Sequence, residues 1–167
     1  LEACRAQIPM SEHVVTMDAE DHARTRGLLS KLLTPRRLSE NEEFMHRLAK
    51  QQLDEFIERG DGEFMGHYAK PFSMLVIADL LGVPEEDHRD FEVVMGGQVV
   101  GSLEDELAHN PLMWLDDRFT RYITERRREP RGDVLTSLAQ AKYPDGSTPE
   151  VDNVVKLATF LFAAGQD

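Results

Sequence analysis

Two side chains that can bind a carboxylate lie one helical turn apart near the start of the chain. His22 and Arg26 are separated by four residues, so they share one face of any helix that contains both. A buried carboxylate needs charge-assisted hydrogen bonds, and the Arg26 guanidinium offers a planar fork of donors to which His22 adds another. Polar pairs with this spacing are also common on exposed helices, and the spacing alone favours that simpler interpretation.

A second candidate site lies at the end of the sequence, where small residues precede an acid. Ala163, Ala164 and Gly165 would leave the backbone of a helix bare, so that another group could approach it closely, and Asp167 follows them. Large side chains at these positions would block such an approach. A helix-packing face that ends in a polar residue explains the same pattern.

Two further pairs have the Glu-x-x-His spacing of di-iron helix bundles, Glu43 with His46 and Glu85 with His88. Glu43 and His46 lie opposite the apolar stripe of their helix, and Glu85 and His88 fall in a polar first turn. Matching inward glutamates on two other helices are missing, so we do not expect a di-iron centre. The single cysteine, Cys4, excludes an internal disulfide and a multi-cysteine metal site.

Composition restricts the possible partners. The 167 residues suffice for one domain with a hydrophobic core, and 31 acidic residues against 19 basic ones give a net charge of -12. Such a chain repels phosphate backbones and anionic lipid surfaces, so we expect neither a nucleic acid nor a membrane as partner. The sequence contains no apolar run long enough to span a bilayer and no signal-peptide pattern at its start, which predicts a cytoplasmic protein.

Apolar residues recur at helical spacing along the whole sequence, and no run of alternating β-branched residues appears. The sequence therefore predicts an all-α fold without an internal repeat. Residues 1–17 show no period and are expected to be loop. The expected helices span residues 18–33, 39–59, 67–81, 84–100, 110–129, 133–142 and 149–167.

Capping patterns indicate where several of these helices begin and end. The residues at 34–35 (Thr-Pro) should end the first helix, and residues 39–42 (SENE) form a capping box that should open the second. Residues 126–128 place three arginines at the negative end of a helix dipole. The last helix is still apolar and periodic at Asp167, which predicts that the sequence is cut at this point.

Four segments, taken in order, resemble the bacterial, soluble cytochromes P-450. The first, MDAEDHARTRGLLSKLLTPRRL (17–38), is similar to the family's C-helix region, where an Asp opens the helix, His and Arg follow four residues apart, and a Thr-Pro-Arg turn comes after. IADLLGVPEEDHRDF (77–91) resembles the junction of the E and F helices. GDVLTSLAQAKYPDGSTPE (132–150) resembles the H helix and the loop after it, and LATFLFAAGQD (157–167) resembles the I helix.

The resemblance covers nearly the whole chain and implies the central helical portion of this fold, from before the C helix to the middle of the I helix. The N-terminal sheet and the cysteine-ligand loop are absent from the sequence. In its intact form the protein would be a heme-thiolate monooxygenase that inserts oxygen into a small hydrophobic organic substrate. The implied cofactor is heme b, and the implied electron donor is a ferredoxin-type redox partner.

The resemblance also assigns roles to residues. His22 and Arg26 would bind the heme propionates, and Asp167 would be the acid that helps deliver protons to reduced oxygen. No residue of the chain would bind the metal, because Cys4 lies outside any glycine-rich loop. The heme would approach Ala164 and Gly165, and the residues expected to face the substrate are Val14, Val15, Phe160 and Ala163.

A basic cluster and one departure from the family pattern complete the comparison. Arg24, Lys31, Arg36 and Arg37 could help to dock an acidic ferredoxin, although a solvated helix face explains the cluster nearly as well. The family often has two prolines after the opening Asp, whereas residues 19–20 are Ala-Glu. The alternative function is a non-enzymatic, all-helical binding or oligomerisation domain, or an inactive fragment that cannot ligate heme iron by itself.

Overall fold

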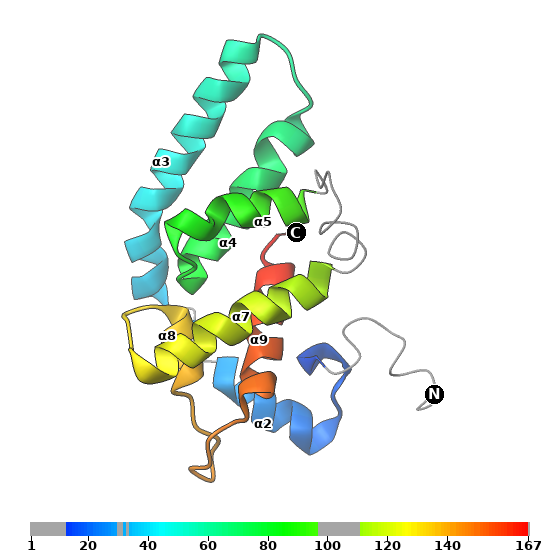
Figure 1. Cartoon of the computed structure of the whole chain (residues 1–167), viewed down its shortest axis with the longest axis vertical. Helices are drawn as coiled ribbons and strands as arrows, with labels where there is room; N and C mark the ends of the chain where they lie inside the picture. Colours follow the sequence, from blue (N-terminus) through cyan, green and yellow to red (C-terminus); the bar gives the residue numbers. More distant parts are fainter. Residues whose placement is uncertain (1–12, 30–31, 33, 97–110, 167) are drawn as a thin grey trace. The chain divides into compact units, whose positions relative to one another are not determined.

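The computed structural model describes residues 13–29, 32, 34–96 and 111–166 (Figure 1). These residues form helices and turns, with no strand among them, which confirms the expected all-α class. They divide into two compact units. The first comprises Leu1–Leu33 and Leu112–Leu161, and the second comprises Thr34–Pro111 and Phe162–Asp167.

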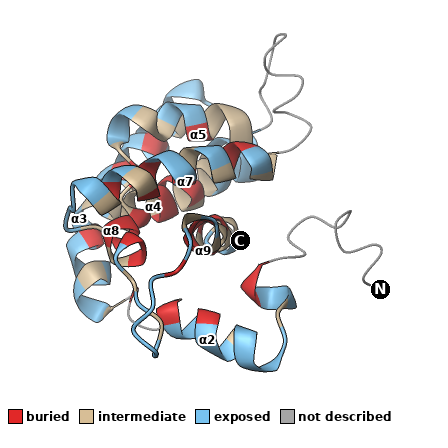
Figure 2. Ribbon diagram, turned by 60° about the horizontal axis from the view of Figure 1, so that its bottom comes forward, coloured by how far each residue is buried: buried red, intermediate tan, exposed pale blue. Residues whose placement is uncertain are grey.

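The first unit is built around the paired helices that follow residue 110. Its elements are the 3-10 turn η1 (Val14–Thr16) and the helices α2 (Ala19–Leu29), α7 (Pro111–Arg128), α8 (Val134–Ala139) and α9 (Val151–Ala164), whose last residues belong to the second unit. The core combines one buried stripe from each of the last three helices (Figure 2). Thr159 is buried within this core, and its hydroxyl donates a hydrogen bond to Asp116 Oδ1 at 2.5 Å. Main members of the core are Leu115, Phe119, Ile123, Leu135, Leu138, Val154 and Leu157.

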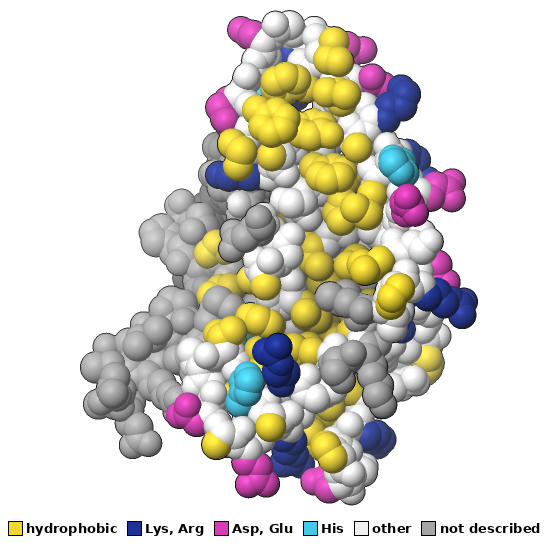
Figure 3. All heavy atoms as spheres, turned by 180° about the vertical axis from the view of Figure 1, so that it is seen from behind, with side chains coloured by type: hydrophobic (Ala, Val, Ile, Leu, Met, Phe, Trp, Pro, Cys, Tyr) yellow, Lys and Arg dark blue, Asp and Glu magenta, His cyan; other side chains and the backbone are white. Residues whose placement is uncertain are grey.

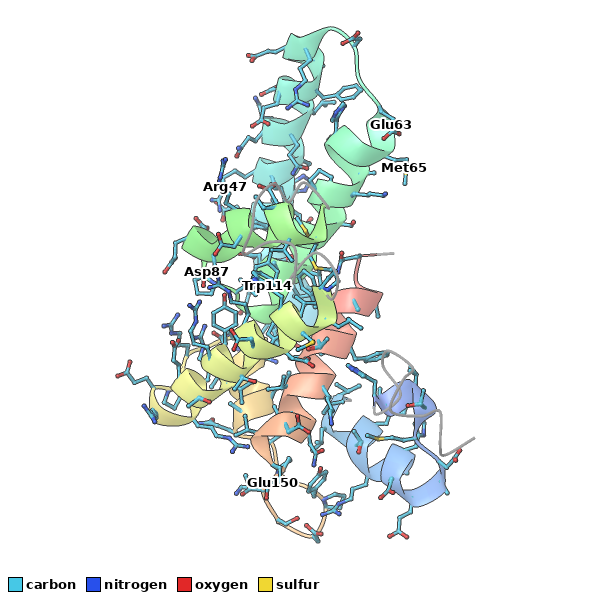
Figure 4. The ribbon with its side chains drawn as sticks, turned by 45° about the vertical axis from the view of Figure 1, so that its right-hand side comes forward. Arg47, Glu63, Met65, Asp87, Trp114 and Glu150 are labelled. Carbon is cyan, nitrogen blue, oxygen red and sulfur yellow. The ribbon has the colours of Figure 1, made fainter. Side chains whose placement is uncertain are left out.

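The second unit is a long helical hairpin with a short helix packed against it. Its elements are α3 (Pro35–Arg59), the π turn η2 (Met65–Ala69), α4 (Lys70–Leu81), the 3-10 turn η3 (Glu85–Asp87) and α5 (His88–Met95). Glu63 opens the π turn, because its carboxylate accepts hydrogen bonds from the backbone amides of Met65 and Gly66 at 2.8 and 2.6 Å (Figure 4). Gly82 ends α4 in a left-handed conformation with φ of 95°, which glycine at a helix C-terminus adopts readily.

The start of α3 corrects one prediction. The helix begins at Pro35, and the expected capping box at residues 39–42 is wrong because those residues lie inside the helix. Thr34 is the N-cap, with its hydroxyl accepting from the Arg37 amide at 3.3 Å, and proline at the first helical position has the φ that a helix requires. Thr-Pro therefore opens a helix here, whereas α2, which it was expected to end, already ends at Leu29.

The boundaries of the other helices differ from the expected ones by a few residues. Residues 14–16 form a 3-10 turn where only loop was expected, and the helix expected over 84–100 is a 3-10 turn followed by α5. Helices α2, α7, α8 and α9 begin one or two residues after the starts expected at 18, 110, 133 and 149. Helices α7 and α8 end before the expected residues 129 and 142, and residues 67–69 of the helix expected at 67–81 belong to the π turn. Residues 1–12, 30–31, 33, 97–110 and 167 lie outside the described part of the chain, so the expected helices are not tested there. None of the described helices is long and apolar enough to cross a membrane.

Hydrophobic side chains gather on one exposed face of the second unit (Figure 3), and several of them are aromatic. The rings of Phe64, Tyr68 and Phe72 stack in sequence with centroids 5.3 and 5.9 Å apart, and Phe56 of α3 meets Phe64 edge-on at 6.5 Å. Phe64 is 55% exposed although it belongs to this stack. Grouped exposed apolar side chains of this kind, unlike scattered ones, mark a face suited to packing against another surface.

A half-buried carboxylate joins α3 to α4. The Asn41 amide donates a hydrogen bond to Asp79 Oδ2, and Asn41 is itself buried. Burial raises the pKa of Asp79, while the nearby His88 and the hydrogen bond from Asn41 act in the opposite direction. The folded state therefore favours the protonated form of Asp79 relative to the unfolded chain.

This raised pKa predicts a specific pH dependence of stability. The contribution of Asp79 to the free energy of unfolding is present below the ordinary aspartate pKa of about 3.9 and is lost as the pH rises through the raised value. Asp79→Asn should remove this loss, so its stability relative to the wild type should increase across that window in urea titrations at a series of pH values. Asn41→Ala should raise the pKa further and extend the loss to higher pH. Parallel curves for Asp79→Asn and the wild type would contradict the assignment.

Candidate functional site

Helix α2 carries the predicted carboxylate-binding pair. His22 is half-buried and Arg26 is exposed, and within the described part of the chain neither side chain takes part in a hydrogen bond or ion pair. The same helix buries Thr25 and Leu28, so it packs through a different face from the one that bears the pair. The donors of both side chains are therefore accessible to a carboxylate from outside the described chain, which is the requirement for binding a heme propionate.

The first residue of α2 explains the departure from the family pattern. Ala19 has φ of 44°, in the left-handed region, where a non-glycine residue carries a strain of roughly 1–2 kcal/mol. The ring of proline fixes φ near −65°, so proline could not adopt this conformation. The chain therefore enters this helix in a way that the prolines often found here in the family would not allow.

The last turn of α9 is packed against α4 within the second unit. A Cβ atom added to Gly165 would lie 2.5 Å from Ile77 Cγ1 and 2.9 Å from Ile77 Cβ. Ser73 Oγ donates to the Gln166 carbonyl at 3.1 Å, and the buried Phe162 ring lies 5.1 Å from that of Phe91. The packing interpretation considered for the small residues therefore accounts for Gly165.

The other residues expected near the heme or substrate have varied surroundings. Ala164 is exposed, and Ala163 and Phe160 are half-buried on α9. Val14 is buried, whereas Val15 is 60% exposed. Asp167 lies outside the described residues. His22 and Arg26 belong to the first unit and Ala163 to Gly165 to the second, so their common binding site stays a prediction.

The basic cluster is partly occupied by internal contacts that the sequence did not indicate. Arg24 donates to Asp145 Oδ2 at 3.0 Å and to Ser147 Oγ at 3.1 Å. Arg36 pairs with Glu40 of its own helix at 2.7 Å. Lys31 lies outside the described residues. The i,i+4 spacing of Arg36 and Glu40 could have revealed their pair, but no local pattern links residues as distant as 24 and 145.

The di-iron alternative receives no support from the described part of the chain. Among these residues, no group of three or more His, Cys, Asp or Glu side chains could hold a metal ion. Glu43 and His46 are exposed on α3, as expected from their position opposite the apolar stripe. The His88 ring nitrogen Nε2 lies 3.2 Å from the Val83 carbonyl, and its ring meets Phe44 edge-on.

The comparisons with known proteins give the class of protein: the chain matches part of the bacterial cytochromes P-450 over nearly its whole length. The polyketide biosynthesis cytochrome P-450 PksS of Bacillus subtilis is 29% identical over 157 residues, which cover 93% of this chain and 38% of that protein. The vitamin D(3) 25-hydroxylase of Pseudonocardia autotrophica is 31% identical over 166 residues, with 98% and 41% covered.

Solved structures agree with the sequence comparison. Substrate-free CYP150A6 of Mycobacterium marinum has a TM-score of 0.82 and 62% identity, over 99% of this chain and 38% of that structure. PksS of Bacillus subtilis 168 has a TM-score of 0.76. No protein-family model matches the chain. The chain spans about two fifths of the length of the relatives that it matches.

Proposed function

We propose that the full natural polypeptide containing this chain is a heme-thiolate monooxygenase, which inserts oxygen into a small hydrophobic organic substrate. The observation that carries the proposal is the pair of donors on α2, His22 and Arg26, which have no partner in the described part of a chain that matches cytochromes P-450 over nearly its whole length. Relatives include the vitamin D(3) 25-hydroxylase and a steroid C26-monooxygenase of Mycolicibacterium smegmatis.

Heme b is the proposed cofactor, and α2 would hold its propionate edge. Arg26 would direct its planar fork at one carboxylate, and His22 would donate from the adjacent turn, so that the charges of the propionates are compensated. Bound heme, with a cysteine thiolate from outside this chain, would supply the oxygen-activating chemistry.

Residues of α9 would form the oxygen and substrate side of the site. Ala164 and Gly165 would allow close approach to the helix, and Phe160 and Ala163 would contact the substrate together with the segment at residues 14–15. Asp167 would hold a proton close to a pocket from which bulk water is excluded, and would release it during oxygen reduction.

A ferredoxin-type partner is the proposed electron donor. Arg36 and Arg37 would contribute positive charge to a surface that steers an acidic partner. The contributions of Arg24 and Arg36 would be reduced, because the carboxylates of Asp145 and Glu40 already lie beside them. The cytoplasmic location expected from the sequence stays a prediction.

The alternative, a non-enzymatic helical binding domain, is favoured by the exposed aromatic face of the second unit. A visible spectrum of the full natural polypeptide separates the two functions. The monooxygenase should bind heme and, when reduced under carbon monoxide, show the long-wavelength band after which the family is named. A purified polypeptide that neither retains heme nor shows this band would favour the binding domain.

Arg26→Ala in the full natural polypeptide tests the heme-binding role directly. Loss of this arginine should leave a propionate without its main partner and weaken heme retention by about 1–3 kcal/mol, measured as heme content and rate of heme release. Arg36→Ala is the control, because Arg36 is also an exposed arginine and belongs to another helix. Unchanged heme content in Arg26→Ala would exclude the assigned role of this face.

A further inference from the structure

The side of α2 opposite His22 and Arg26 is attached to the loop between α8 and α9. Successive residues of a helix are rotated by about 100°, so residues 22 and 26 point in nearly one direction and residue 24 points away from both. Arg24 donates from one guanidinium nitrogen to Asp145 and Ser147, at 3.0 and 3.1 Å. Its guanidinium carbon also lies 3.8 Å from the centre of the Tyr143 ring.

The loop that receives Arg24 is internally ordered. Asp145 Oδ1 accepts from the Ser147 amide at 2.8 Å, and the Tyr143 amide donates to the Ser147 carbonyl at 3.0 Å. Gly146 supplies the positive φ of 82° that this turn requires. The hydroxyl and amide of Ser147, and then the charge of Arg24, hold the pKa of Asp145 below its usual range. Arg24 therefore meets a preformed, ionised acceptor.

The base of the same loop is fixed to α7. Arg127 donates to the Ala139 carbonyl at 3.2 Å and to the Pro149 carbonyl at 2.7 Å, so both ends of the loop are held by one side chain. The contact of Arg24 thus connects α2 to a rigid part of the first unit. An exposed ion pair by itself stabilises the fold little. The Arg24 guanidinium, however, is held in a defined geometry, because it contacts Asp145 and Ser147 and also stacks on the Tyr143 ring.

Apolar burial alone restrains α2 weakly. Thr25 and Leu28 are buried among its eleven residues, and both lie towards its end. With so narrow a buried stripe, polar contacts contribute to the orientation of the helix about its axis. A rotation would move the donors of His22 and Arg26 away from a ligand, and misplacement by an ångström is enough to impair binding.

We propose that Arg24 is a positioning residue, which together with Tyr143 and Asp145 fixes the rotation of α2 so that His22 and Arg26 face one anionic ligand. The inference rests on the proposed function for the identity of that ligand, the heme propionates. Arg24 itself does not touch the ligand, because its guanidinium is directed at the loop.

The test compares Arg24→Gln, Asp145→Asn, Arg26→Ala and the double variant Arg24→Gln with Arg26→Ala in the full natural polypeptide. Heme release should be about tenfold faster in Arg24→Gln and in Asp145→Asn than in the wild type. The double variant should release heme faster than Arg26→Ala alone by clearly less than tenfold, because one part of the effect of Arg24 is exerted through Arg26 and only the part exerted through His22 remains. Arg24→Lys retains the charge and should restore part of the wild-type rate.

A second readout does not depend on heme. Amide hydrogen exchange in α2 of the heme-free polypeptide should be faster in Arg24→Gln and Asp145→Asn, and unchanged in the control Arg36→Gln. Additive effects of Arg24→Gln and Arg26→Ala, or normal exchange in α2, would overturn the positioning role. If Arg26→Ala weakens heme retention and Arg24→Gln does not, the inference fails while the proposed function stands. If the wild type retains no heme, the proposed function fails, and with it the ligand assigned to this face.

Discussion

Asp133→Ala is expected to lower the free energy of unfolding by about 3–5 kcal/mol, because this side chain has two structural roles. Its Oδ1 accepts from the Thr136 amide at 2.7 Å and caps α8. Its Oδ2 accepts from Arg126 Nε at 2.8 Å, and the Arg126 side chain is 1% exposed. Alanine would remove the cap and leave a buried guanidinium without its main carboxylate.

Two further variants separate the cap from the charge. Asp133→Ser keeps an oxygen that can cap α8 but removes the carboxylate, so most of the loss in the free energy of unfolding should remain. Glu125 should compensate part of this loss, because its carboxylate lies 3.8 Å from the Arg126 guanidinium. Adding Arg126→Met to Asp133→Ser removes the buried charge as well and should recover much of the stability. Urea unfolding of the three variants measures these terms. If Asp133→Ser were as stable as the wild type, the cap alone would account for the role of Asp133.

The arginines at the end of α7 illustrate what the sequence could predict and what it could not. Three cations in the last turn indicated a helix end, and α7 does end at Arg128. Their type and spacing could not show that Arg126 is buried or that Arg127 reaches the carbonyls of Ala139 and Pro149. These roles depend on how α8 and α9 pack, which no local pattern specifies.

The same distinction applies to the helices and to the candidate site. Periodicity predicted the existence of the helices because it reflects the burial of one helix face. The start of α3 was misplaced because two capping patterns, at residues 34–35 and 39–42, occur five residues apart. The pair on α2 was found from its spacing and from the family resemblance. The contact of Arg24 with Asp145 was missed because it joins residues 121 positions apart. For Gly165 the sequence indicated a close approach, but the approaching side chain, Ile77, appears only in the fold.

Gly165→Val is expected to destabilise the second unit by about 3 kcal/mol, at the upper end of the usual cost of overpacking. The added Cβ would lie 2.5, 2.8 and 2.9 Å from Cγ1, Cδ1 and Cβ of Ile77. Cδ1 is the movable end of that side chain, but Cβ is fixed by the backbone of α4, so a rotamer change cannot relieve the contact. The end of α9 would have to move, which would strain the hydrogen bond from Ser73 to the Gln166 carbonyl.

Two controls show whether the loss arises at this contact. Gly27→Ala adds a Cβ inside α2 where no atom beyond the neighbouring residues and the helix's own backbone lies within 4 Å, and it should raise stability by about 0.5–1 kcal/mol. Ile77→Ala removes the two outer atoms that a Cβ at residue 165 would meet. Combined with Gly165→Val it should show a favourable coupling of about 0.5–3 kcal/mol in a double-mutant cycle of urea unfolding. Additive effects would mean that the close approach to Ile77 is not what restricts residue 165.

Gly165→Val has to be measured both without and with heme. The comparison distinguishes the two explanations for this glycine, packing against α4 and close approach by heme. Packing against α4 exists without a ligand, so the full stability loss should appear in the heme-free polypeptide. A requirement for close approach by heme would add a second effect, a loss of heme affinity that Ile77→Ala does not rescue. If Ile77→Ala restores both the stability and the heme affinity of Gly165→Val, glycine is required at residue 165 for the contact between α9 and α4. Close approach by heme would then be predicted for Ala164 alone.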